Sequence, residues 1–120
     1  MGRRSRRRSG RAAAPAAPES RYADAEGNEL CLRGSLTVGS RREIAAAIAG
    51  NPLSREDAAQ RAFELLFERL AVRWTVAGVP TEGQRELLGR LRLASPAERR
   101  WVRETLRAHC AEHFPDVAVP

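Results

Sequence analysis

From residue 40 onward, signals that start helices alternate with signals that stop them, and this alternation constrains the fold more than any other feature. Ser40 with Glu43, and Ser95 with Glu98, have the spacing of a capping box, in which serine and glutamate side chains satisfy free amides of a first helical turn. Glycine or proline follows each predicted helix end. The helices are predicted over residues 40–49, 54–77, 81–93 and 95–113.

The predicted helix over 54–77 is apolar on two faces. A helix of that kind is buried on two sides, so we expect it to be the central element. One face carries Ala59, Ala62, Phe63, Leu66, Leu70, Trp74 and Ala77, and the other carries Leu65, Val72 and Val76. Short loops make neighbouring helices antiparallel, so the predicted fold class is mainly α, a small four-helix bundle.

The residues before the first helix predict less structure. Leu30, Leu32, Leu36 and Val38 have even spacing, which indicates a short strand or a hairpin interrupted at Gly34. The chain before it is rich in arginine, then in alanine and proline, and cannot bury enough apolar surface to fold. We therefore expect residues 1–25 to form a disordered basic tail and linker, and residues 26–117 to form one helical domain.

The order of elements over residues 30–70 resembles the ribbon-helix-helix repressors, in which a strand is followed by a helix, a turn and a second helix. The resemblance implies a strand that reads DNA, with Arg33, Arg41 and Arg42 near the phosphates. It covers about a third of the chain and no motif specific to that family accompanies it.

Most of the formal net charge of +6 belongs to the tail. All 21 basic residues are arginine, and six of them lie before residue 12, whereas residues 21–120 hold fifteen arginines against fourteen acids. Arginines that neutralise phosphates release counterions, which gives unspecific and salt-dependent affinity. The candidate nucleic-acid-binding residues of the tail are Arg3, Arg4, Arg6, Arg7, Arg8 and Arg11.

A second basic feature lies in residues 85–107, which hold seven arginines against three glutamates. Arg99, Arg103 and Arg107 recur every four residues with Arg100 beside them, and we call these four residues the arginine stripe. Such a stripe can meet phosphates or an acidic protein, and it can equally be a solvated helix face. Residues 91–103 also loosely resemble a helix-turn-helix, although the usual glycine in the turn is absent.

No combination of residues indicates catalysis. The chain has neither a GxxxxGK[ST] nor a GxGxxG loop, and His109, Cys110 and His113 supply too few ligands for a metal site by themselves. Cys31 and Cys110 form no metal-binding spacing and are expected to be free thiols in a reducing cytoplasm. We expect no enzyme activity, no cofactor and no metal, and no run of apolar residues reaches the length of a membrane span.

Two functions remain open on the sequence alone. The first is a small cytoplasmic binding protein that associates unspecifically with nucleic acid through its tail and the arginine stripe. The alternative is a protein-interaction module, such as a homodimeric scaffold or adaptor, with no nucleic-acid role.

Overall fold

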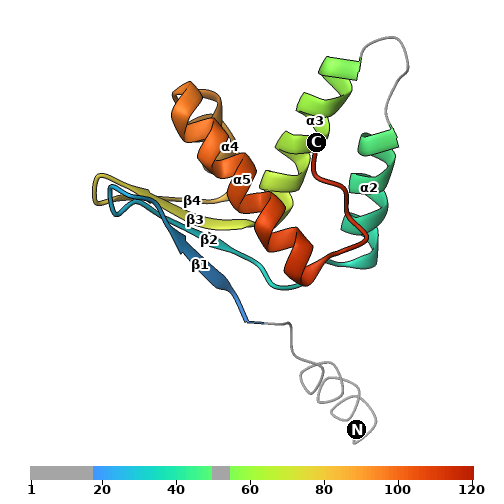
Figure 1. The fold of residues 1–120 in the computed structure, drawn as a ribbon, viewed down its shortest axis with the longest axis horizontal. Coiled ribbons are helices and arrows are strands. Elements are labelled where there is room, and N and C mark those ends of the chain that lie inside the picture. Colours follow the sequence, from blue (N-terminus) through green and yellow to red (C-terminus); the bar gives the residue numbers. More distant parts are fainter. Residues whose placement is uncertain (1–17, 50–54) are drawn as a thin grey trace, which may run out of the picture.

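In the computed structural model, which describes residues 18–49 and 55–120, the chain forms an α+β domain with a four-stranded antiparallel sheet (Figure 1). The predicted mainly α four-helix bundle is therefore wrong. The described residues do form four helices, but these pack with a sheet that the spacing analysis did not predict. The elements are β1 (Ser20–Ala23), β2 (Glu29–Leu32), α2 (Val38–Ala49), α3 (Arg55–Leu70), β3 (Ala71–Val76), β4 (Val79–Glu82), α4 (Gln84–Arg92) and α5 (Pro96–His113).

The strands lie in the order β1-β2-β3-β4, and each neighbouring pair is antiparallel. Tyr22, Leu30, Trp74 and Thr81 form one row across the sheet. Leu30 and Trp74 are buried, and α3, α4 and α5 lie on one side of the sheet in Figure 1. Because side chains alternate between the two faces of a strand, this row belongs to the face that the helices cover.

The prediction of one helix over residues 54–77 is wrong beyond Leu70, where α3 ends and β3 begins at once. Ala77 and Gly78 have positive φ angles of 51° and 79° and join Val76 to its partner Val79. Two consecutive residues of this kind form the two-residue turn that matches the twist of a β-hairpin. The glycine at 78 thus connects two strands instead of ending a helix.

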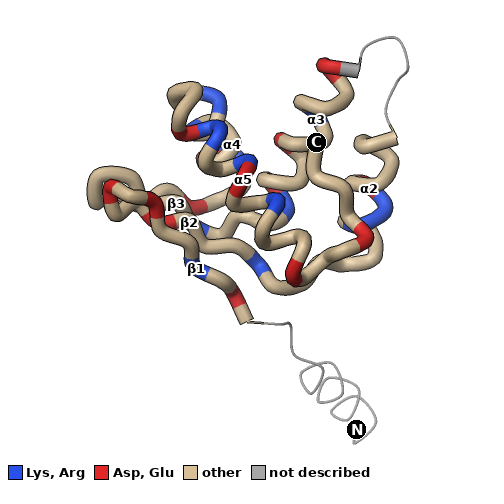
Figure 2. Tube along the Cα trace, in the orientation of Figure 1, with Lys and Arg blue, Asp and Glu red and all other residues tan. Residues whose placement is uncertain are grey.

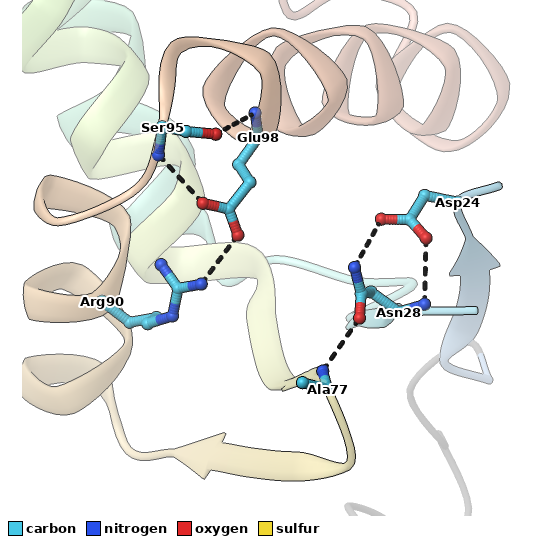
Figure 3. Close-up of polar contacts among 6 residues, drawn as sticks. All are labelled: Asp24, Asn28, Ala77, Arg90, Ser95 and Glu98. Carbon is cyan, nitrogen blue, oxygen red and sulfur yellow. Dashed lines mark hydrogen bonds and ion pairs between the residues drawn. The ribbon is translucent and has the colours of Figure 1, made fainter. Parts of the chain in front are cut away.

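The sheet also begins inside the segment that we expected to be tail and linker, because β1 occupies Ser20–Ala23. Its hairpin with β2 closes through the Asp24 carboxylate, which accepts hydrogen bonds from the backbone amides of Glu26 and Asn28 (2.9 Å each). The Asn28 side chain in turn accepts a hydrogen bond from the Ala77 amide at 2.9 Å (Figure 3). This hydrogen bond therefore joins the turn between β1 and β2 to the turn between β3 and β4. The expected disorder of residues 1–17 lies outside the described residues.

The strand predicted between Leu30 and Val38 is much shorter than expected. The chain leaves the sheet after Leu32, next to an irregularity of the β2–β3 register, and Val38 is already helical. β2 is an inner strand between β1 and β3. It is therefore not available as the ribbon that the ribbon-helix-helix resemblance implies.

The predicted helix start agrees with the structure for α5 but not for α2 and α4. The capping box of Ser95 and Glu98 is confirmed, and α5 extends to His113 as predicted. α2 begins before Ser40, because the Thr37 hydroxyl accepts the hydrogen bond from the Ser40 amide (3.0 Å). α4 begins only after Gly83, with no side-chain cap. The stop at Gly50 lies outside the described residues.

The core fills the space between the sheet and α3, α4 and α5. The predicted inner face of the long helix is confirmed in part. Its members Ala59 and Ala77 are exposed, whereas the other five are buried, namely Ala62, Phe63, Leu66, Leu70 and Trp74. No helix of the described residues is long and apolar enough to cross a bilayer. The largest fully buried side chains are Trp74, Phe63, Phe67, Phe114, Leu30, Leu32, Ile44, Leu66, Leu70, Leu87, Leu91 and Leu106.

Candidate nucleic-acid interface

Several arginines of residues 85–107 are used inside the fold. The Arg90 guanidinium lies 2.7 Å from the Glu98 carboxylate (Figure 3). It also lies 4.8 Å from the centre of the Trp74 ring. Glu98 also accepts the amide hydrogen bond of Ser95 (2.9 Å), which lowers the pKa of its carboxyl group, as does Arg90. Arg90 therefore joins α4 to α5 and to the sheet, and it is not free to bind a ligand.

Arg92 is also paired, in its case with α3. Its Nη2 and Nε atoms lie 2.9 and 3.3 Å from the two carboxylate oxygens of Glu64, and these hydrogen bonds lower the pKa of Glu64. The pair lies along a groove of about 360 Å³ whose lining includes Phe63 and Arg99. Because Glu64 faces this groove, the groove contains both charges and does not form a continuous basic surface.

The arginine stripe differs, because none of its four residues forms an ion pair within the described part of the chain. At about 100° per residue, Arg99, Arg100, Arg103 and Arg107 lie within an arc of about 100° on α5. Figure 2 shows basic residues along α4 and α5 and acidic residues at the turn between β1 and β2. One acid, Glu104, borders the stripe on its exposed side. The four arginines therefore lie on one side of α5.

The four residues of the stripe are not equivalent. The Arg103 guanidinium lies 4.7 Å from the centre of the Phe63 ring, and its buried Nε has no hydrogen-bond partner among the described residues. Arg99 donates to the backbone carbonyl of Arg92 (2.8 Å). Arg100 and Arg107 are exposed, with no polar contact to other described residues. These two arginines are therefore available to a ligand.

The arginine-rich tail is attached beside the last turns of α5. The Tyr22 hydroxyl lies 2.7 Å from Nδ1 of His109, and the Ser20 hydroxyl lies 3.4 Å from Nε2 of His113. Both contacts join β1, the first strand after the tail, to α5, which carries the stripe (Figure 1). The strand that follows the tail and the helix that carries the stripe are therefore in direct contact, although they lie more than 80 residues apart in sequence. The tail arginines themselves lie outside the described residues.

His109 is a buried structural residue in this arrangement. Its Nε2 lies 2.6 Å from the Arg33 carbonyl oxygen, which can only accept, so Nε2 donates and Nδ1 accepts from Tyr22. Burial lowers the pKa of His109 and raises that of the Cys110 thiol to about 11. Within residues 18–49 and 55–120 no three histidine, cysteine or acidic side chains are grouped to hold a metal ion.

Sequence reasoning missed Ser20 and Tyr22, which hold β1 on α5. The available sequence signal was the set of turn-forming residues from Asp24 to Asn28, between the two short segments that form β1 and β2. In the structure, Gly27 of this turn has a φ of 82°. The partners of Arg90 and Arg92 were also missed, because they lie eight and 28 residues away in sequence.

The fold and its basic surface define a small α+β domain with a basic helix next to the root of an arginine-rich extension. Comparisons with protein-family models, with curated proteins and with solved structures found no match.

Proposed function

We propose that this protein is a small non-enzymatic binding protein that associates with nucleic acid through its arginine-rich tail and the arginine stripe. The observation that carries the proposal is that Arg100 and Arg107 are exposed and have no polar partner among the described residues, on the helix that β1 contacts. The runner-up function, a protein-interaction or homodimeric scaffold domain, has no comparably specific contact in its support.

The charge distribution gives the tail and the stripe different roles in binding a nucleic acid. Of the 21 arginines, six lie in residues 1–17, and the remaining fifteen are balanced by fifteen acidic residues. The folded part therefore exerts little net attraction on a polyanion. The tail attracts the nucleic acid over a long range, and the stripe contacts its phosphates at short range.

The covalent link allows both features to bind one molecule. Arg11 is nine residues before Ser20, so it can reach at most about 30 Å from the start of β1. α5 has 18 residues and is about 27 Å long. The tail is therefore long enough to contact the same nucleic acid as the stripe, and a second contact within one complex benefits from a high effective concentration.

Two further observations suit an intracellular role. Cys31 and Cys110 are both free and buried, as expected for thiols of a reducing compartment. We propose a cytoplasmic location on the ground of these two thiols.

The test is a salt titration of nucleic-acid binding with full-length protein and three variants. One variant replaces the two stripe arginines that have no polar partner among the described residues (R100Q/R107Q). A matched control replaces Arg42 and Arg61, which are exposed and form no ion pair with a described residue (R42Q/R61Q), so both variants carry the same net charge. A third changes the six tail arginines to glutamine, namely Arg3, Arg4, Arg6, Arg7, Arg8 and Arg11.

The slope of log K against log salt should fall by about 2 in R100Q/R107Q and by up to about 5 in the tail variant, because each phosphate contact contributes about 0.9. The control should keep the slope of the unchanged protein. The proposal is overturned when no variant or parent protein retards a probe at low salt, or when R42Q/R61Q loses as much as R100Q/R107Q.

A further inference from the structure

We infer that the nucleic acid bound by the stripe is double-helical DNA of the B form, held by its phosphates, and not a single strand. This inference rests on the proposed function and names its ligand. It comes from the placement of the aromatic residues and from the length and composition of the stripe.

Every aromatic side chain of the protein is committed to the interior of the fold. Phe63, Phe67, Trp74 and Phe114 are at most 1% exposed. The other two, Tyr22 and Trp101, are partly buried and pack against the core, and the Tyr22 hydroxyl is bonded to His109. Residues 1–17 and 50–54 contain no aromatic residue. The chain therefore has no fully exposed ring on which an unpaired base could stack, and only Tyr22 and Trp101 keep part of their surface open to solvent.

The scarcity of exposed ring surface favours a double-stranded over a single-stranded ligand. Proteins that bind single strands gain much of their affinity from bases stacked on aromatic rings. Without stacking, the cost of ordering a flexible strand along the helix is not offset. A duplex needs no such ordering, because its phosphates are already fixed in two rows and at a higher charge density.

The length of the stripe fits a duplex of the B form. Arg100 and Arg107 are seven residues apart, which corresponds to about 10 Å along the helix axis. The major groove of B-DNA is about 12 Å wide, so these two long side chains can contact phosphates of both strands. The major groove of duplex RNA is narrow and deep, and it offers no comparable seat to a helix.

The composition of α5 predicts that this helix does not read adenine through amide side chains. Between Pro96 and His113 the helix contains no asparagine, glutamine or serine, and its one threonine, Thr105, is buried. Arg103 is held against Phe63. The amide side chains that read adenine are thus missing from this surface, and phosphate contacts carry no sequence information directly.

The experiment measures fluorescence anisotropy with three probes of one sequence: a 24-base-pair DNA duplex, the corresponding single DNA strand and the corresponding RNA duplex. Full-length protein, R100Q/R107Q and the control R42Q/R61Q are titrated at about 0.1 M salt. The tail contributes to binding of every probe, so the quantity compared is the ratio of affinities between parent protein and variant. Equal urea midpoints of the variants and the parent show that the fold is intact.

The stripe variant should lose about tenfold or more in affinity for the DNA duplex, because two phosphate contacts are removed. It should lose less than about threefold on the single strand and on the RNA duplex, where the stripe has no fitted seat. An equal loss on the single strand, or on the RNA duplex, overturns the inference and leaves the proposed function standing. Absence of binding to all three probes overturns the proposed function itself.

Discussion

The contact between Tyr22 and His109 makes a quantitative prediction about how β1 is held on the domain. His109 has no exposed surface, and its Nε2 hydrogen is used by the Arg33 carbonyl. Its Nδ1 must therefore accept, and the Tyr22 hydroxyl is its donor at 2.7 Å. Replacing Tyr22 by phenylalanine removes the donor and leaves a buried acceptor without its partner.

The expected cost follows from the environment of the two rings. A buried polar atom left unpaired costs about 1–3 kcal/mol. Tyr22 is only partly buried, so water can partly replace its hydroxyl and the lower part of that range applies. The phenyl ring keeps the edge-on contact of Tyr22 with the His109 ring, whose centre is 5.6 Å away. We expect Y22F to lower the free energy of unfolding by about 1–2 kcal/mol.

The assay is urea unfolding followed by tryptophan fluorescence, since Trp74 is 1% exposed in the core. For a chain of this size, a loss of that magnitude moves the midpoint by about 1 M. The matched control is S20A on the same strand, whose contact with His113 is long at 3.4 Å, and it should cost less than about 0.5 kcal/mol. A Y22F variant as stable as S20A would refute the assignment of the Tyr22 hydroxyl as the donor that His109 requires.

Two further predictions concern stability. Burial lowers the pKa of His109 below its ordinary value of 6.5, so below that pH the unfolded chain binds more protons than the folded chain. The free energy of unfolding should therefore fall as the pH drops from about 6.5 toward 5, above the range of the carboxylates, and urea unfolding of H109Q should lack this dependence. Ala77 has a φ of 51°, which glycine adopts without cost, so A77G should raise the free energy of unfolding by about 0.5–1 kcal/mol in the same assay. An unchanged or lowered stability of A77G would contradict the strain assigned to this turn.

The parts of the fold that could be predicted are those specified by local contacts. The start of α5 is fixed by Ser95 and Glu98, whose side chains each accept a hydrogen bond from the other's backbone amide. Pro96 adds to this at the first helical position, where its missing amide costs nothing. The stripe follows from that helix, because its residues recur at helical spacing. Neither depends on a distant part of the chain.

The sheet could not be obtained in this way, because strands are stabilised by partners far away in sequence. Val72 and Val76 are four residues apart and also fit a helix face, so their spacing did not exclude a continuation of α3. What decides the conformation of this segment is its pairing with β2 and with β4. The β-branched residues Val72, Thr75 and Val76, followed by Ala77-Gly78, were the local hint.

The same limit applied to the charges. The sequence of residues 85–107 indicates a basic region, but it does not show which guanidinium groups are paired with carboxylates. The structure assigns Arg90 and Arg92 to carboxylates and Arg103 to an aromatic ring. A count therefore overstates the charge that is available to a ligand.

This partition changes what the domain can contribute to binding. Because the folded part carries equal numbers of arginines and acids, its attraction for a polyanion is short-ranged and depends on where its few free arginines lie. Residues 1–17 add attraction for any polyanion, because they contain six arginines, no acidic residue and no aromatic residue. On the proposed function, selection between ligands comes from Arg100 and Arg107. Their removal should therefore change which nucleic acid is preferred, whereas removal of the tail arginines should weaken binding of all nucleic acids alike.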